Sequence, residues 1–438
     1  MRLGYQTKET AMKKHCRKKT AGKIQLSIAK PGEGIGDLLY NVHLDFRELM
    51  VKGGLKIMRE LFEADIEALC GPRYVHNGDE NQSGQRWGAQ RGTVVMGGQK
   101  IVVHKPRIRK GGKEVLLPSY EALQREDPLN DRTLEQMIIG VSTRNYARSL
   151  DEQSPAMERC AISRSSVSRR FVAMSQARLD ATLHAPLDDR NWASLMIDGI
   201  QFGEHVIVIA LGIDTTGAKH VLGLREGSTE NATLCKEMLS DMVSRGLPAD
   251  QSILIVIDGG KGIRKAVGQV FGSYAVIQRC QVHKRRNVLD QLPAERRPHA
   301  KSILEQAYKP TTTVATAERL LRNLAKSLEE KYPGAAASMN EGLDETLAIK
   351  SLNLPAALSR SFSTTNAIEN LNGTVRKVTQ RTKRWRGGKM ILRWVATGVF
   401  EAQDGFRRVR GHQSMSVLWD ALRKRDDQLK GDNMKQVG

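Results

Sequence analysis

The chain is short of cysteine, of aromatic side chains and of long apolar segments. Its 438 residues include 5 cysteines and 5% aromatic residues. An odd number of scattered cysteines argues against a disulfide-rich secreted protein and favours reduced thiols. No apolar run reaches the roughly 18 residues of a membrane-spanning helix, and the basic N-terminus lacks the apolar core of a secretory signal. We therefore expect a cytoplasmic protein without a membrane-spanning segment.

Acidic residues are scarce relative to basic ones. The 69 Lys and Arg residues outnumber 48 Asp and Glu residues, which gives a formal net charge of +21 at pH 7. Such an excess is typical of proteins that bind a phosphate backbone, although ribosomal and membrane-surface proteins share it. The imbalance is largest from Asn370 to Phe400, where eight Lys or Arg residues occur without one Asp or Glu. The composition favours a nucleic acid as partner.

The N-terminal part of the chain combines a helical and a β pattern. Apolar residues recur at helical spacing from Gly36 to Leu69, with a break at Gly53-Gly54 and a stop at Gly71. Residues 85–117 alternate in period two around Gly97-Gly98 and predict a β-hairpin with basic strands.

Residues 131–178 predict two short helices joined by a short connection. Their second helix opens on the polar run SRSS and carries Arg164, Arg169 and Arg170. This arrangement resembles a helix-turn-helix, in which the second helix presents its first residues to a DNA groove. An ordinary pair of well-capped helices is the alternative interpretation. In the helix-turn-helix interpretation the three arginines contact DNA.

From Ala193 onward the pattern becomes that of an α/β domain. Three apolar runs, SLMIDGIQF, HVIVIALGID and KHVLGLREG, predict antiparallel strands, and two further strands then alternate with helices. A dinucleotide-binding fold would alternate strands and helices from its start, whereas the order βββαβαβα matches an RNase-H-like sheet. Residues from about Pro293 to Leu354 are helical in pattern and predict an all-α insertion.

These patterns divide the chain into a series of predicted segments. They are a basic N-terminal arm (1–35), a DNA-binding region with the hairpin and the helix-turn-helix (36–185), an RNase-H-like catalytic domain in two parts (190–292 and 361–410), an all-helical insertion between those parts (293–360) and a C-terminal tail (411–438).

Two acidic residues follow apolar strands of the α/β domain, Asp198 in LMIDGI and Asp258 in LIVIDGG. Each taken alone fits a turn, because Asp-Gly is a frequent turn pair. In an RNase-H-like sheet, however, the first and fourth strands are neighbours, so the two carboxylates would lie side by side and repel each other. A divalent cation relieves that repulsion, and hard oxygen ligands suit Mg²⁺ or Mn²⁺. Asp214 in GIDTTG also ends a strand, but it opens a hairpin turn and is interpreted as structural.

Glu369 is the candidate third ligand, on the far side of the insertion. Thr364 or Thr365 can cap the helix that follows, which places Glu369 in its first turns. A carboxylate there also interacts favourably with the helix dipole, which is an alternative reason for its position. Trp385 either stacks on a base or belongs to the core. The basic residues expected to hold a phosphate backbone beside the acids are Arg376, Lys377, Arg381, Lys383, Arg384 and Arg386.

Cys280 and His283 form a C-x-x-H pair just past the fifth predicted strand. The pair has the spacing of half a zinc site, but no second Cys/His pair at ligand spacing accompanies it, which argues against structural zinc. His283 is expected instead to touch the scissile phosphate, with the adjacent Lys284, Arg285 and Arg286 as further DNA contacts.

Four motifs in this order resemble those of the Mutator-type transposases of bacterial insertion sequences: MIDGIQF, VIDGGKGIRKAV, QRCQVHKRRNV and STTNAIENLNGTVRKVTQRTKRW. GVSTRNYARSL with ISRSSVSRRF resembles the upstream helix-turn-helix of that family. The resemblance implies a DDE recombinase of a bacterial, nucleoid-associated kind, whose RNase-H-like domain is interrupted by a helical insertion. It implies Asp198, Asp258 and Glu369 as the catalytic triad, with Cys280 and His283 helping to position DNA.

The expected chemistry is metal-assisted phosphoryl transfer on double-stranded DNA, with two Mg²⁺ or Mn²⁺ ions per site. Water would cleave at the element end, and the freed 3′-OH would then attack target DNA. Because two ends must be joined, the resemblance implies a homodimer or larger assembly. The alternatives are a structure-selective nuclease or resolvase of the same fold, and a non-catalytic DNA-binding regulator derived from a transposase.

Overall fold

A computed structural model of the chain describes residues 35–73, 84–96, 99–125, 131–146, 163–229, 231–380, 382 and 384–437. The predicted N-terminal arm and the Gly97-Gly98 tip lie outside these residues. The chain is a mixed α/β protein that divides into two compact units, Met1–Gln136 with Val141–Ser168, and Met137–Gly140 with Arg169–Gly438. Among the helices of the described ranges, none is both long enough and apolar enough to cross a membrane.

The first unit packs a long helix on a small antiparallel sheet. Its helix α1 runs without interruption through Gly53-Gly54, so the predicted break is wrong. Met58 and Phe62, which follow the glycines, are buried against the sheet and its flanking helix, and this packing outweighs the weak helix propensity of glycine. The stop at Gly71 is confirmed, since Gly71 has a φ of +73°. The elements are α1 (Ile35–Cys70), β1 (Gln85–Met96), β2 (Gln99–Lys110), β3 (Lys113–Val115), α2 (Pro118–Arg125) and α3 (Asp131–Ile138).

The region predicted as a helix-turn-helix is described only in part. Helix α3 and helix α5 (Arg164–His184) are present, but residues 147–162 between them lie outside the described part of the chain. The helix-turn-helix therefore stays a prediction. On α5, Arg164 and Arg169 are exposed and Arg170 is half-buried.

The second unit is built on a five-stranded sheet in the order β6-β5-β4-β7-β8. The predicted order of three strands followed by alternating helices and strands is confirmed, and so is the adjacency of the first and fourth strands. These two, β4 and β7, are parallel, while β4, β5 and β6 form an antiparallel meander. The elements are β4 (Trp192–Phe202), β5 (His205–Asp214), β6 (Lys219–Gly227), α6 (Ala232–Ser244), β7 (Ile253–Ile257), α7 (Lys261–Phe271), β8 (Ala275–Arg279) and α8 (Gln281–Asp290).

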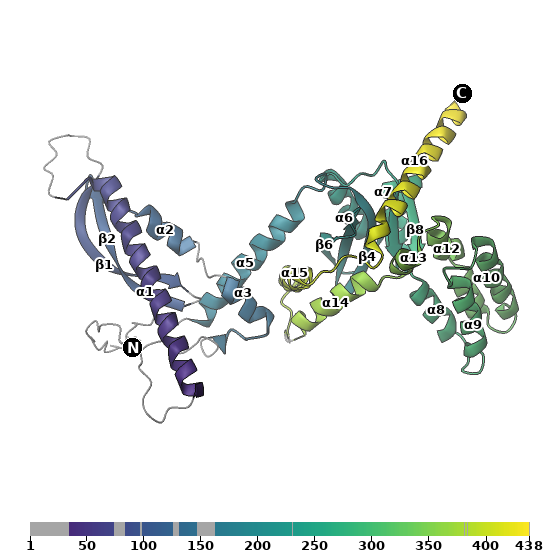
Figure 1. The fold of residues 1–438 in the computed structure, drawn as a ribbon, viewed down its shortest axis with the longest axis horizontal. Coiled ribbons are helices and arrows are strands. Elements are labelled where there is room, and N and C mark those ends of the chain that lie inside the picture. The colour runs from purple at the N-terminus through teal and green to yellow at the C-terminus, as the bar shows by residue number, and fades with distance from the viewer. Residues whose placement is uncertain are drawn as a thin grey trace, which may run out of the picture. The chain divides into compact units, whose positions relative to one another are not determined.

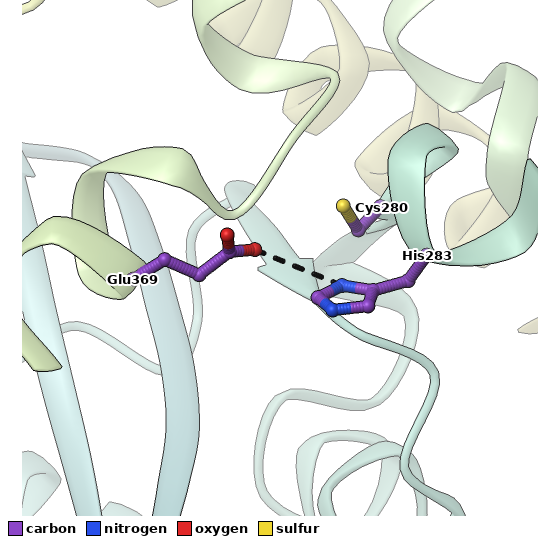
Figure 2. A group of neighbouring side chains, drawn as sticks. All are labelled: Cys280, His283 and Glu369. Carbon is purple, nitrogen blue, oxygen red and sulfur yellow. Dashed lines mark ion pairs between the residues drawn. The ribbon is translucent and has the colours of Figure 1, made fainter. Parts of the chain in front are cut away.

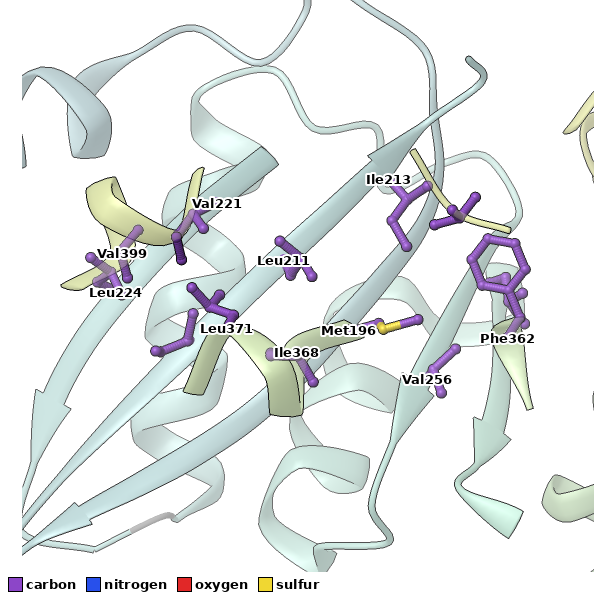
Figure 3. Packing of buried hydrophobic residues seen from close by; sticks show 14 of the residues in the cluster. Met196, Leu211, Ile213, Val221, Leu224, Val256, Phe362, Ile368, Leu371 and Val399 are labelled. Carbon is purple, nitrogen blue, oxygen red and sulfur yellow. The ribbon is translucent and has the colours of Figure 1, made fainter. Parts of the chain in front are cut away.

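Helices cover both faces of this sheet. Successive residues of a strand point to opposite faces, and in the central strands the residues on both faces are apolar. Leu195 and Ile197 of β4 belong to the cluster that includes α6 and α7. Met196 and Ile200 belong to the opposite cluster, with helices α14 (Asn366–Thr379) and α15 (Gly388–Asp404). Figure 3 shows Ile368 and Leu371 of α14 against the strands of that second face.

Most of the helices between α8 and α14 share a core of their own, which also takes in Val288 of α8 and Leu292 just after it. Leu358 and Phe362, shortly before α14, belong instead to the core of the sheet. At the end of the chain, α16 (Met415–Val437) begins inside the segment predicted as a tail. Leu418 and Leu422 of α16 are buried in the core of the sheet, and Asp426 accepts a hydrogen bond from the Ser252 backbone at 2.7 Å. The remaining helices are α9 (Arg297–Tyr308), α10 (Val314–Leu328), α11 (Pro333–Asn340), α12 (Leu343–Ser351) and α13 (Ala356–Phe362) (Figure 1).

Candidate active site

Asp198 and Asp258 are brought to the same level of the sheet by strand register. Ile197 of β4 lies opposite Ile257 of β7 in a parallel pair, so the acidic residues that follow are next to each other in register. Alternation along the strands directs both toward the face that α14 covers, since Met196 and Val256, two residues earlier, pack on that face. The prediction that these two acids are neighbours agrees with this register.

Helix α14 carries Glu369 on the face of the sheet toward which the two aspartates are directed. Thr365 is its N-cap residue, and Glu369 lies in the first turn. One turn further along, Asn372 donates a hydrogen bond from Nδ2 to Asp198 Oδ2 at 2.7 Å. Three residues of helix rise about 4.5 Å, so Glu369 lies about one turn of α14 from the contact with Asp198. Among the described residues, the candidate metal ligands whose atoms lie within 4.8 Å of one another group Glu369 with Cys280 and His283 and not with the two aspartates.

The charge on Asp198 is destabilised by its surroundings. Burial, and then repulsion from Asp258, raises the pKa of Asp198 to about 6, and Glu369 adds to the repulsion. The Gly199 backbone N–H and His283 act in the opposite direction. Three carboxylates thus interact electrostatically although they come from three separate segments of the chain.

The carboxylate oxygens of the acids are ligands that suit a divalent cation. Within the part of the chain that the structure describes, the hydrogen-bond donors on Asp198 and Asp258 are neutral groups: the Gly199 and Gly260 backbone N–H groups and the Asn372 amide. None of these donors cancels the negative charge, whereas a hard cation such as Mg²⁺ or Mn²⁺ does so through carboxylate oxygens. The chemistry of the residues therefore fits the ions that the sequence predicts.

Cys280, His283 and Glu369 form a second cluster within the same site. Their candidate ligand atoms all lie within 4.8 Å of one another. His283 Nδ1 lies 3.8 Å from Glu369 Oε1, and Figure 2 shows the two side chains directed toward each other. The pKa of His283 is raised, mainly by its hydrogen bond with Cys280. Burial alone raises the pKa of the Cys280 thiol, but hydrogen bonding with His283 and Thr365 outweighs it and lowers that pKa.

Two residues of the site were not predicted to take part in it, Asn372 and Thr365. Asn372 contacts Asp198, and the Thr365 hydroxyl donates to Glu369 Oε1 and lies 3.4 Å from His283 Nδ1. Both share the helix face of Glu369 at spacings of three and four residues, which is the signal that points to them. The sequence predicts Thr365 only as a possible cap of the helix that carries Glu369. Its side chain makes no capping hydrogen bond.

Asp214 differs from the site acids as expected. Its Oδ1 accepts bonds from the Thr216 and Ala218 N–H groups and from the Thr216 hydroxyl, and its Oδ2 lies 3.0 Å from His220 Nε2. All of these partners belong to its own hairpin. Asp214 is therefore a turn residue.

The structure contradicts the prediction that Lys284 contacts DNA. Its side chain is buried, with 4% exposure for the residue, and Nζ donates to the carbonyls of Ser338 and Glu341. Burial, and then the neighbouring Arg279, lowers the pKa of Lys284 to about 8. Lys284 therefore joins α8 to α11 and is not presented to a phosphate backbone.

The other predicted phosphate contacts are more accessible. Arg285 is half-buried beside Glu305, while Trp385 is half-buried with its ring edge-on to Phe202, which assigns Trp385 to the core. Arg381 and Lys383 lie outside the described residues. The exposed members of the predicted set are Arg286, Arg376, Lys377, Arg384 and Arg386.

Comparison with known proteins places the chain in a family. Residues 44–409 match the family described as "Transposase, Mutator family". The chain is 26% identical over 367 residues to the transposase for insertion sequence element ISRM5 of Rhizobium meliloti (strain 1021), covering 83% of this chain and 89% of that protein. It is 26% identical over 384 residues to the transposase for insertion sequence element IS905 of Lactococcus lactis subsp. lactis (strain IL1403), covering 83% and 91%. The chain belongs to the Mutator family of transposases.

Proposed function

We propose that this chain is a DDE transposase that binds the ends of an insertion sequence and cleaves and transfers DNA strands in a metal-dependent reaction. The observation that carries the proposal is the register of Asp198 beside Asp258, together with the contact of Asn372 on α14, the helix of Glu369, with Asp198. The strand order, in which β4 pairs with β5 and β7, supports the RNase-H-like assignment. Membership in the Mutator family favours a transposase over a nuclease or a non-catalytic regulator.

Asp198, Asp258 and Glu369 are the residues that would hold two Mg²⁺ or Mn²⁺ ions. When bound, such ions lower the pKa of water and offset negative charge on the scissile phosphate and its leaving oxygen. Asp198 is the acid whose pKa both other carboxylates raise, so a bound cation would relieve the repulsion on it. Asn372 fixes the Asp198 carboxylate, so its orientation does not depend on a bound ion.

The remaining residues of the site hold DNA and orient the triad. His283 faces Glu369 and is half-buried, so it is placed to donate to a phosphate oxygen beside the acids. The exposed Arg376 and Lys377 follow on the same helix and would neutralise flanking phosphates. Strand transfer at two ends calls for a homodimer or larger assembly on double-stranded DNA.

The proposal is tested with a plasmid that carries the element with its own flanking repeats. Purified protein is expected to produce 3′-OH breaks at the element ends in Mg²⁺ or Mn²⁺ and none in the presence of a chelator. Asp258→Asn is expected to abolish the breaks, whereas Asp214→Asn, in the hairpin turn, serves as the structural control. End cleavage that persists in Asp258→Asn would contradict the proposal.

A further inference from the structure

We propose that Cys280, His283 and Glu369 bind a zinc ion, and that zinc bound there inhibits DNA cleavage by withdrawing Glu369 from Asp198 and Asp258. The inhibition rests on the proposed function. Zinc binding by the three residues does not, and it is tested separately below.

The positions of the ligand atoms suit a tetrahedral ion. All three lie within 4.8 Å of one another, and His283 Nδ1 is 3.8 Å from Glu369 Oε1. Zinc bonds of about 2.0 to 2.3 Å separate tetrahedral ligands by roughly 3.3 to 3.8 Å. Small movements of the three side chains would therefore bring their ligand atoms to bonding distance of one ion. Figure 2 shows the three side chains.

The ligand types distinguish this set from the triad. A thiolate, an imidazole and a carboxylate are the ligands that zinc takes, whereas magnesium prefers oxygen alone. On binding, the metal replaces the proton of the Cys280 thiol, which leaves to solvent. One thiolate and one carboxylate then balance the two positive charges of the ion. Glu369 belongs to both sets, so it serves one ion or the other.

The backbone already holds two of the ligands in place. Cys280 is the N-cap residue of α8, and His283 lies in its first turn. The Cys280 N–H donates to the Ile257 carbonyl at 2.8 Å, which ties the motif to the end of β7. The start of a helix also favours a thiolate over a thiol. The cost of ordering the ligands on binding is therefore small.

Thr365 marks the centre of the cluster. Its buried hydroxyl donates to Glu369 and lies 3.4 Å from His283 Nδ1. Two of the three potential ligands thus contact one neutral oxygen, and the same hydroxyl is a hydrogen-bond partner of the Cys280 thiol. An ion that enters the cluster displaces this hydroxyl from Glu369 or takes it as a further neighbour.

The site suits reversible zinc binding, and the fold does not depend on zinc. Cys280 is buried, and an ion would reach it past Glu369 and His283, whose side chains are 39% and 26% exposed. The helices that carry the ligands are already anchored by apolar residues, Val288 on α8 and Ile368 and Leu371 on α14. Zinc here would regulate the triad and would not be required for the fold. This agrees with the lack of a second Cys/His pair at ligand spacing in the sequence.

Cobalt(II) reports directly on such a site, because cobalt takes the same ligands and a cobalt–thiolate bond absorbs in the near ultraviolet. The full chain, stripped of metal, is titrated with Co²⁺ and then with Zn²⁺. We expect a thiolate-to-cobalt absorption band that saturates at one equivalent and disappears when Zn²⁺ is added. The absence of the band in a folded protein would overturn the proposal.

Variants assign the band to the three residues. Cys280→Ser is expected to abolish it, while Cys235→Ser, which alters a buried thiol on α6 in the same unit, is expected to retain it. Glu369→Gln keeps the shape of a half-exposed side chain and is expected to weaken Co²⁺ binding by roughly 10-fold or more. A band that survives Cys280→Ser, or an affinity that Glu369→Gln leaves unchanged, would contradict the assignment.

The inhibitory role is measured on the plasmid substrate. Zn²⁺ at its measured dissociation constant is expected to halve Mg²⁺-dependent cleavage, and a zinc-selective chelator is expected to restore it. Cleavage that is unaffected by saturating Zn²⁺ would refute the inhibition while the cobalt spectrum still decides the binding. A chain that cleaves no DNA in Mg²⁺ would instead count against the proposed function.

Discussion

The side-chain amide of Asn372 on α14 donates a hydrogen bond to the carboxylate of Asp198 on β4 at 2.7 Å. The two residues are 174 positions apart in the sequence, and the helical insertion lies between them. This contact joins the helix that carries Glu369 to the strand that carries Asp198. The helix of Glu369 is therefore held against the sheet by a polar contact with Asp198 as well as by the apolar packing of α14.

Asn372→Ala is expected to lower end cleavage by about 10- to 100-fold, which is the usual cost of losing a contact that orients a metal ligand. Affinity for DNA should stay within about twofold of the parent, because Asn372 is buried. Asn370→Ala, at an exposed position of the same helix, is the matched control and should be near neutral. A variant that cleaves at the parent rate would show that the contact does not orient Asp198.

Asp198→Asn is expected to stabilise the metal-free protein at pH 8. The pKa of Asp198 is raised in the folded state from 3.8 to about 6, so its ionisation costs folding free energy above pH 6. The stability that neutral Asp198 contributes is present below pH 3.8 and is lost as the pH rises through about 6. The full shift corresponds to up to about 3 kcal/mol.

Urea titrations of parent and Asp198→Asn at pH 5 and pH 8, with a chelator present, measure this difference. The variant should gain more stability at pH 8 than at pH 5. Equal effects at the two pH values would mean that Asp198 is not held at a raised pKa.

Glu345→Gln is expected to destabilise the second unit by about 3 kcal/mol. The buried Arg279 guanidinium donates from Nε to Glu345 Oε2 at 2.6 Å, which joins β8 to α12, and loss of the partner leaves a buried charge poorly compensated. Glu318→Gln removes the exposed pair with Arg322 and should cost less than about 1 kcal/mol. Chemical denaturation compares the two. Equal costs would show that the Arg279 pair does not anchor the insertion.

Arg376→Ala and Lys377→Ala are each expected to weaken DNA binding and to reduce the slope of log affinity against log salt by about 1. Both side chains are exposed on α14 beyond Glu369. Lys331→Ala, at an exposed position of the insertion, tests whether any lost positive charge has the same effect. Fluorescence anisotropy on end DNA at several salt concentrations gives the slopes. An unchanged slope in both α14 variants would remove this helix from the DNA interface.

Much of the second unit was predictable because its signals are local. Apolar runs of strand length, separated by turn residues, fix the order of strands and helices, and a parallel pair of neighbouring strands then fixes the level of Asp198 and Asp258. The helix of Glu369 was also predictable. The polar contact that joins this helix to the sheet was not, because Asn372 is a neutral residue whose importance appears only when α14 is packed on β4.

Two predictions were wrong, those for Lys284 and for Gly53-Gly54, and tertiary packing is the cause in both. Lys284 was assigned to DNA from its basic neighbours, yet Gln281, Lys284 and Val288 follow at helical spacing and form the buried side of α8. The break expected at Gly53-Gly54 did not occur, because packing of the residues beyond it holds α1 together. In both cases tertiary contacts decided the outcome, and composition alone did not reveal them.

Replacement of Glu369 by Gln tests the catalytic assignment most directly, because it removes one negative charge and keeps the shape of a half-exposed side chain. End-DNA affinity and the rate of strand cleavage in Mg²⁺ are measured on the same preparation. If Glu369 is the third acid of the triad, cleavage falls by about 1,000-fold or more, which corresponds to about 4 kcal/mol, and affinity stays within about twofold. Cleavage at the parent rate would show that the three carboxylates do not act together.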